Sequence, residues 1–306
     1  MVGDAVVITT GGTIAATGST HLDGADLVHA LGLAHPVRTR AVCSLGSWEM
    51  DSADWLTIAD AAVDELRAGS RVVVTTGTAT LEELAYFLLE VTGNADLVVT
   101  GATRPRWSPS ADGEANLKAA LMVSTSTEGL GTVVAIGSMV YSALDCYKEN
   151  ANRADGFAAR HGGAVATITG GAVVRHGHRR VHMDASGVPS CLPLARVATF
   201  ALGTEPYLAD FDDFRADALV AEAPGLAMVP PTARKYLCHI AASKPVVVVA
   251  RPPRGLGIDR VHYPDMWDDL ECAGVIVEPV LDLHKARIRM ALLLGHGLSR
   301  YLPVAL

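Results

Sequence analysis

The amino-acid sequence predicts an α/β protein with a larger parallel-sheet domain followed by a smaller α/β domain. Apolar, β-branched segments alternate with helix-like segments through the first half, at a spacing typical of parallel strands joined by right-handed crossovers. The alternation restarts near residue 214, after an irregular stretch that contains several prolines. The 306 residues suffice for two full cores. We therefore predict an N-terminal domain over residues 1–190, a linker over 191–212 and a C-terminal domain over 213–306.

One strand–turn–helix segment has the clearest local pattern. The Val-rich residues 71–75 predict a buried parallel strand, and residues 81–92 predict an amphipathic helix. Thr80 at the N-cap with Glu83 three residues later predicts a capping box. Thr78 then lies at the carboxyl end of a strand, where ligands bind in open α/β sheets. For this segment alone, an ordinary strand–helix turn is an equally good interpretation.

The start of the chain repeats this arrangement. Residues 5–10 are rich in β-branched residues, Gly11 and Gly12 follow as a turn, and Thr13 comes next. If the two strands are neighbours in a parallel sheet, Thr13 and Thr78 converge on one pocket. A threonine hydroxyl is a weak nucleophile unless a base activates it and donors stabilise the oxyanion. Other parts of the chain must supply those groups.

The remaining elements follow the same alternation. We expect helices over 25–31, from Ser52 or Asp54 to 68, from about residue 110, and over 282–290, and strands within 42–51, 97–102, 133–136, 218–221, 245–249 and 274–277. The basic residues 175–180 are interpreted as the solvated tip of a hairpin between 172–174 and 181–183.

Composition excludes several classes of function. The net charge of −8 disfavours nucleic-acid binding, and no apolar run approaches the roughly 18 residues that a membrane span needs. We find no signal-peptide pattern, and five scattered cysteines argue against a disulfide framework, so we expect a cytoplasmic protein. A mature exported form whose signal peptide has been removed stays open as the alternative. No CxxC or HExxH spacing occurs, so we expect no metal site and no cofactor.

Several motifs resemble, in order and over nearly the whole chain, those of the bacterial-type L-asparaginase/glutaminase family. The first is Thr10-Gly11-Gly12-Thr13-Ile14-Ala15, and the second, residues 76–88, resembles the family's TGTDTxEETAxFL. Further matches are Arg104-Pro105, Ser110-Ala111-Asp112-Gly113 with Asn116-Leu117, Lys148 with residues 143–147, and Lys285-Ala286-Arg287-Ile288. One such motif would be weak evidence, but this ordered set is specific.

The resemblance implies a two-domain asparaginase-like fold and a homodimer or homotetramer with active sites near the interface. Family enzymes hydrolyse a small side-chain amide through an acyl-threonine and release ammonia. By resemblance, Thr13 is the nucleophile, while Thr78 and Lys148 form the second threonine–lysine pair. Ser47 is expected to hold the substrate's α-carboxylate. The other expected substrate-binding residues are Gly12, Trp48, Gly77 and Ala79.

Ala79 is the most important departure from the family pattern. The family has an aspartate there, which contributes to binding the substrate's α-amino group. Alanine removes that negative charge and acceptor. Two explanations stay open: Ala79 is an engineered inactivating change, or the natural substrate lacks the group that the aspartate recognises.

Other departures surround the same pocket. Trp48 replaces a small polar residue or Gln, residues 16–27 lack the tyrosine of the family's lid, and residues 223–230 replace a Gly-rich stretch that carries an Asn. Trp48 and Met228 would make the pocket more apolar. We expect altered specificity. His21 is a possible replacement for the lid tyrosine, although a lone histidine in a polar segment is more often simply exposed.

Two alternative functions remain. A degenerate family member could bind a small molecule or partner without chemistry, as Ala79 and the missing tyrosine suggest. A tRNA-linked amidotransferase subunit shares the fold, but the acidic charge and the lack of its N-terminal extension disfavour it. Asp112 and Asn116 are expected to fix a loop and cap a helix rather than bind substrate.

Overall fold

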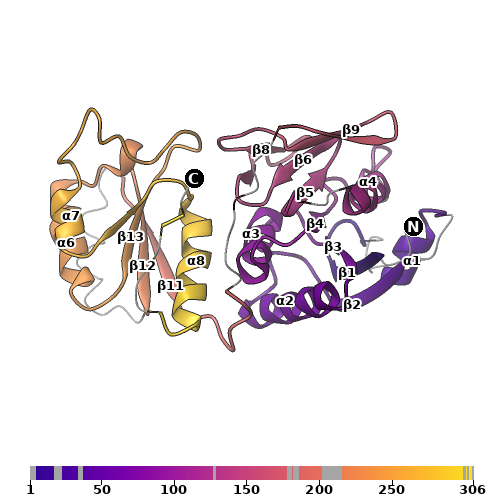
Figure 1. Ribbon diagram of the computed structural model, residues 1–306, viewed down its shortest axis with the longest axis horizontal. Coiled ribbons are helices and arrows are strands. Elements are labelled where there is room, and N and C mark those ends of the chain that lie inside the picture. Colours follow the sequence, from indigo (N-terminus) through magenta and orange to yellow (C-terminus); the bar gives the residue numbers. More distant parts are fainter. Residues whose placement is uncertain are drawn as a thin grey trace. The chain divides into compact units, whose positions relative to one another are not determined.

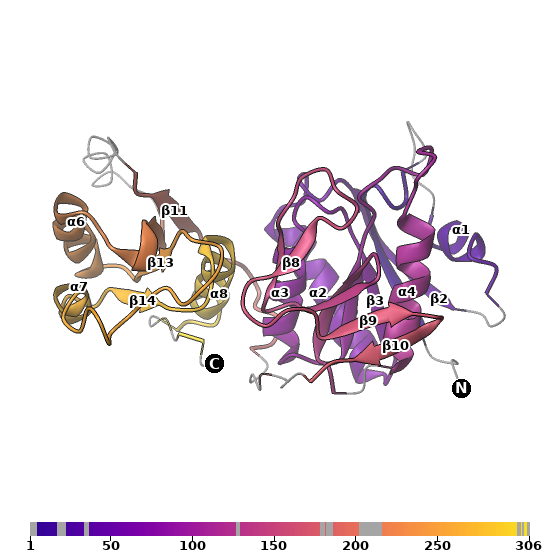
Figure 2. The same ribbon diagram turned by 90° about the horizontal axis from the view of Figure 1, so that it is seen from above.

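The computed structural model describes residues 5–16, 23–33, 37–126, 129–177, 181, 186–201, 216–298, 301 and 303–304. The chain forms two compact units, Met1–Val188 and Pro189–Leu306. Figures 1 and 2 show each unit as a sheet with helices packed on it.

The first unit is built on an eight-stranded sheet in the order β10-β9-β6-β5-β4-β3-β1-β2. Strands β2, β1, β3, β4 and β5 are parallel, and β6, β9 and β10 extend the sheet in antiparallel pairing. The strands are β1 (Ala5–Gly11), β2 (Arg38–Leu45), β3 (Arg71–Thr75), β4 (Leu97–Thr100), β5 (Thr132–Ile136), β6 (Met139–Ser142), β9 (Ala166–Thr169) and β10 (Ala172–Arg175). A separate antiparallel pair consists of β7 (Cys146–Lys148) and β8 (Phe157–Ala159). The predicted parallel core is thus confirmed, with an antiparallel extension at one edge.

Helices cover both faces of this sheet. They are α1 (Gly24–His29), α2 (Ser52–Arg67), α3 (Leu81–Thr92) and α4 (Gly113–Ser126). The core that includes Val73, Val98 and Val133 also includes apolar residues of α1 and α4, so these two helices share one face. Helices α2 and α3 pack on the other face (Figure 1). The rings of Trp55 in α2 and Phe87 in α3 lie 5.4 Å apart. Burial on both faces explains the continuous valines of β3.

One local prediction in this unit was wrong in detail. Helix α2 is capped by Asp51, whose side chain accepts from the backbone N–H of Asp54 while the Asp54 side chain accepts from that of Asp51. Asp54 is therefore the third helical residue of the capping box and not the cap. Strand β10 pairs with β9, the strand before it in the chain. Residues 182 and 183, most of the predicted hairpin partner of β10, lie outside the described residues.

Part of the basic cluster that the sequence placed at a hairpin tip, residues 178–180, also lies outside the described residues, as does His21.

The second unit has a four-stranded parallel sheet in the order β11-β12-β13-β14. Its elements are β11 (Ala195–Thr199), β12 (Ala218–Ala223), the 3₁₀ turn η2 (Gly225–Ala227), α6 (Pro231–Ala241), β13 (Val246–Ala250), α7 (Asp268–Cys272), β14 (Ile276–Glu278) and α8 (Leu283–Gly295). Strand β11 lies inside the range predicted as a linker. Strand β11 pairs with β12, with Ala195 opposite Ala218, so it is an edge strand of the second sheet.

Candidate active site

The turns that follow β1 and β3 are packed directly against each other. Gly12 has a φ of 77°, and a Cβ added to it would lie 2.4 Å from the amide nitrogen of Gly77. Only glycine permits both the left-handed conformation and this close approach. Thr13 and Thr78 each follow one of these glycines, so the fold brings the two predicted threonines onto neighbouring turns at the carboxyl ends of β1 and β3.

Lys148, the last residue of β7, contacts the second threonine. Its Nζ donates to Oγ1 of Thr78 at 3.0 Å and to the carbonyl oxygen of Thr78 at 3.1 Å. The same Nζ lies 5.8 Å from the centre of the Phe157 ring, and the backbone N–H of Lys148 donates to Oε1 of Glu82 at 3.2 Å. These contacts fix both the backbone and the amine of Lys148. A lysine held in this way can polarise a hydroxyl as an ammonium or accept a proton as a neutral amine.

Ser47 follows β2 and supplies a buried hydroxyl. The residue is 2% exposed, and its Oγ has no hydrogen-bond partner among the residues that the structure describes. A Cβ on Gly77 would lie 2.8 Å from this Oγ, so the hydroxyl borders the turn that carries Thr78. A buried hydroxyl without a partner is costly in a folded protein unless a ligand or water satisfies it. The position is consistent with a ligand contact.

The hydroxyl of Thr80 holds the segment that contains Ser47. Thr80 Oγ1 donates to the carbonyl oxygen of Ser47 at 3.1 Å, and Thr80 makes no side-chain cap for α3. The capping box with Glu83 was therefore a wrong prediction. The hydroxyl instead connects the start of α3 to the loop after β2, a partner 33 residues away in the chain.

Trp48 and Ala79 lie at the exposed edge of this site. Trp48 is 72% exposed, and its ring lies over the backbone of Gly46. Ala79 is exposed and presents a methyl group directly after Thr78. Met228, the other predicted apolar contributor, follows η2 in the second unit.

Asp112 and Asn116 fix the loop after β4, as predicted. Asp112 accepts from the N–H and hydroxyl of Thr103 at 3.1 and 2.6 Å and from the N–H of Arg104 at 2.9 Å. Asn116 donates to the carbonyl oxygen of Gly101 at 2.9 Å. Both side chains are bonded to other groups of this loop and its neighbours, as expected for residues with a structural role.

A cavity of about 350 Å³ opens beside Thr13. It is lined by Thr13, Ile14, Ala102, Arg104, Arg106, Ala111, Gly113 and Glu114. In the sequence Arg104 stands out only as part of a motif, and nothing local there indicates this cavity. The available signal was position, because Arg104 follows closely on a strand next to β3 and carboxyl ends of parallel strands meet at one edge.

Neither a metal cluster nor a membrane helix is seen in the described part of the chain. No group of three or more His, Cys, Asp or Glu residues there could hold a metal ion, and none of its helices has the length and apolarity to cross a bilayer.

Comparison with known proteins gives consistent matches. The family model "Asparaginase, N-terminal" matches residues 4–180. A Deinococcus radiodurans protein named "Probable L-asparaginase" is 33% identical over 248 residues, which cover 78% of this chain and 75% of the relative. A Haemophilus influenzae protein named "Probable L-asparaginase periplasmic" is 31% identical over 177 residues, which cover 53% of this chain and only 51% of the relative.

The fold also matches solved structures over nearly the whole chain. A probable cytoplasmic L-asparaginase from Campylobacter jejuni superposes with a TM-score of 0.84 at 24% identity, covering 95% of both chains. The thermostable L-asparaginase from Thermococcus kodakarensis gives the same TM-score at 23% identity and covers 95% of this chain and 93% of that one. The two-domain α/β fold is therefore that of asparaginases, and the chain belongs to the asparaginase family.

Proposed function

We propose that this protein is an amidohydrolase of asparaginase type that forms an acyl-enzyme on Thr13. The observation that carries the proposal is the bond from Lys148 Nζ to Thr78 Oγ1, on the turn packed against the one that bears Thr13. A threonine hydroxyl is a weak nucleophile, so it requires a correctly placed base and a group that accepts its proton.

The reaction balances without a cofactor. Thr13 Oγ attacks the amide carbonyl carbon, its proton passes to the leaving nitrogen, and the C–N bond breaks with release of ammonia. A water molecule, activated by Thr78 with Lys148, then cleaves the ester and restores Thr13. We assign oxyanion stabilisation to backbone N–H groups near Thr13 and Thr78 other than that of Gly12, which donates to the carbonyl of Leu45 at 2.9 Å.

The substrate in this proposal differs from asparagine at its α-amino end. The unpartnered hydroxyl of Ser47 is assigned to a substrate carboxylate. Ala79 provides no charge for an ammonium group. We therefore propose a small carboxylate-bearing amide that lacks the amine. We also propose a cytoplasmic homo-oligomer, dimer or tetramer, with the active site near its interface.

The test combines turnover with trapping of the intermediate. The protein is incubated with L-asparagine, L-glutamine and succinamate, released ammonia is measured, and acid-quenched samples are analysed by intact and peptide mass spectrometry. We expect an acyl adduct on the peptide containing Thr13 and loss of both signals in Thr13→Ala. Thr57→Ala is the matched control, because the Thr57 hydroxyl bonds only within its own helix, to the carbonyl of Ala53.

The second candidate is a family member that binds its ligand without chemistry, which Ala79 favours. The outcomes separate the two proposals. Binding of an amide by calorimetry without ammonia release or an adduct supports the binding protein and contradicts the hydrolase.

A further inference from the structure

The cavity beside Thr13 lies on the side of the site away from Ser47. Its walls come from the loop after β4 and from the first turn of α4, where a Cβ on Gly113 would lie 3.0 Å from a side-chain carbon of Ile14. Ser47 precedes α2, and its carbonyl accepts from Thr80 at the start of α3. Helices α2 and α3 cover the opposite sheet face from α4 (Figure 2). The turn that carries Thr13 therefore packs against the turn of Gly77, which borders Ser47, and Thr13 itself lines the cavity.

The cavity is much larger than the ammonia that a primary amide releases. A cavity needs only about 10–15 Å³ of comparable volume to hold a molecule of the size of water or ammonia. The cavity measures about 350 Å³. An amine of amino-acid size fits in this volume.

The two arginines of the cavity wall differ in whether their charge is balanced. Arg106 is paired with Glu114 at 2.8 Å, so those two charges largely compensate each other. Arg104 also lines the cavity, but among the described residues its guanidinium has no hydrogen bond or ion pair. At longer range its charge helps to lower the pKa of Asp155, an effect due mainly to the hydrogen bond from Arg153.

The Arg104 backbone is firmly placed, whereas its side chain has no partner among the described residues. Its N–H donates to Oδ1 of Asp112, and Asp112 is tied in turn to Thr103. An arginine whose backbone is held in this way presents its fork of donors from a defined position, and such a fork can bind a planar carboxylate through two parallel hydrogen bonds.

We propose that this cavity binds the leaving amine of a secondary amide, and that this amine carries a carboxylate which pairs with Arg104. The inference rests on the proposed function and names the substrate class of that same site. Thr13 Oγ attacks the carbonyl carbon, the C–N bond breaks, and the proton from Thr13 goes to the nitrogen, so an amino acid leaves in place of ammonia. Water then hydrolyses the ester, and the sum is one amide and one water giving one carboxylate and one amine.

The experiment compares leaving groups on a constant acyl half. The full-length protein is assayed with three β-aspartyl amides, whose leaving groups are ammonia, glycine and the neutral isostere glycinamide, and with the same three succinyl amides. Released amines are separated and quantified by chromatography to give kcat/KM. Wild-type protein, Arg104→Gln and Arg104→Lys are compared. The control is Arg67→Gln, which removes an exposed arginine at the end of α2.

We expect wild-type kcat/KM to be at least tenfold higher for the glycine amide than for the glycinamide amide. Arg104→Gln should reduce this ratio to near one, Arg104→Lys should retain part of it, and Arg67→Gln should keep it in full. Ammonia release without release of glycine, or a glycine preference that survives in Arg104→Gln, overturns this inference and leaves the hydrolase intact. Failure to cleave any of the six amides overturns the proposed function and this inference with it.

Discussion

The Nζ of Lys148 lies 3.0 Å from Oγ1 of Thr78, so the small β7–β8 pair and the turn after β3 meet at one hydroxyl. The contact is supported from α3, since Glu82 accepts the backbone N–H of Lys148. The chain thus joins residues about 70 positions apart into one polar unit beside Thr13. This unit determines the first prediction.

Lys148→Met removes the amine but keeps most of the apolar stem beside Phe157. We expect kcat to fall by about 10²–10⁴-fold, the range typical for loss of a positioned acid–base group. The melting temperature should stay close to that of the wild type. Lys118→Met, at an exposed position of α4, is the control and should keep wild-type kcat. Retention of full activity in Lys148→Met would remove this lysine from the mechanism.

Thr80→Val tests whether the hydroxyl of Thr80 positions Ser47. The change leaves the shape of residue 80 but removes its bond to the Ser47 carbonyl. We expect KM for a carboxylate-bearing amide to rise several-fold while kcat changes less, because the loop that holds the substrate loosens and Thr13 is untouched. Thr80→Ser should restore KM. Equal effects of Val and Ser would contradict a role of the hydroxyl.

Ala79→Asp restores a carboxylate directly after Thr78. If the wild-type substrate lacks an α-amino group, kcat/KM for L-asparagine should rise at least tenfold relative to succinamate, because the new charge pairs with the substrate ammonium. Ammonia release from both amides measures the ratio. Activity on L-asparagine only in the variant would mark Ala79 as an inactivating change in an ordinary asparaginase. Activity on neither amide in either protein would direct the search to larger, more apolar amides or to binding without chemistry.

The sequence predicted well those helices and strands whose type and limits depend mainly on their own residues. The bounds of β3 and α3 agree with the predicted 71–75 and 81–92, because a buried valine run and an amphipathic face are visible in sequence. The position of Thr13 beside Thr78 was also predicted, because the carboxyl ends of neighbouring parallel strands lie at the same edge of a sheet. By contrast, β11 was assigned to a linker, since an exposed, mixed-polarity edge strand becomes recognisable only through its pairing with β12.

The side-chain contacts within the site were less predictable than its location. Thr80 carries the capping signal, but its hydroxyl bonds to a distant carbonyl, so tertiary contact overrode local propensity. Arg104 likewise gives no local sign that it lines a cavity with Thr13, because the cavity exists only when the loop after β4 folds beside the turn after β1. Motif resemblance supplied the proposed reacting groups, and the structure was needed for their surroundings.

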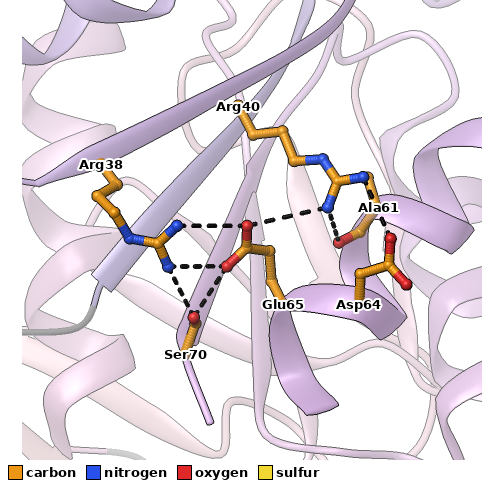
Figure 3. A network of polar contacts seen from close by, with 6 residues as sticks. All are labelled: Arg38, Arg40, Ala61, Asp64, Glu65 and Ser70. Atoms are coloured by element: carbon orange, nitrogen blue, oxygen red, sulfur yellow. Dashed lines mark hydrogen bonds and ion pairs between the residues drawn. The ribbon is translucent and has the colours of Figure 1, made fainter. Parts of the chain in front are cut away.

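A polar network connects β2 to the end of α2 (Figure 3). Arg38 donates to both oxygens of Glu65 and to Ser70 Oγ, while Arg40 bonds to the carbonyl of Ala61 and to Asp64. The hydrogen bond from Arg38 lowers the pKa of Glu65, although burial acts in the opposite direction. A lowered pKa means that Glu65 stabilises the fold above its unfolded-state pKa and loses this contribution as pH falls through the folded value.

Glu65→Gln should therefore lower the free energy of unfolding at pH 7 by about 1–2 kcal/mol, as expected for a lost charge-assisted hydrogen bond. Acidification from pH 5 to pH 3 should cost the variant less stability than the wild type. Urea unfolding over this range measures both effects. Asp64→Asn, whose carboxylate is largely exposed, is the control and should lose less than about 1 kcal/mol. An identical pH slope in Glu65→Gln and wild type would contradict the assignment.

Glu278, at the end of β14, supplies the last prediction. Its fully buried carboxylate accepts from the N–H of Val280 at 2.8 Å, that of Val304 at 3.2 Å and the Tyr301 hydroxyl at 3.0 Å, which attaches the end of the described chain to the second sheet. Burial nevertheless raises the pKa of Glu278, against the lowering effect of these hydrogen bonds. With a raised folded-state pKa the native protein binds more protons than the unfolded one, so stability falls as pH rises from the ordinary carboxyl pKa through the folded value.

The sign of this effect distinguishes Glu278 from Glu65. Native-state hydrogen exchange at the Val304 N–H should give an opening free energy that decreases from pH 5 upward, with a slope of at most about 1.4 kcal/mol per pH unit for one proton. Glu278→Gln cannot ionise, so its opening free energy should be independent of pH over the same interval. Glu271→Gln, at a half-exposed carboxylate of α7, should keep the wild-type slope. A wild-type opening free energy that increases with pH would mean that the hydrogen bonds to the carboxylate outweigh the cost of burying its charge.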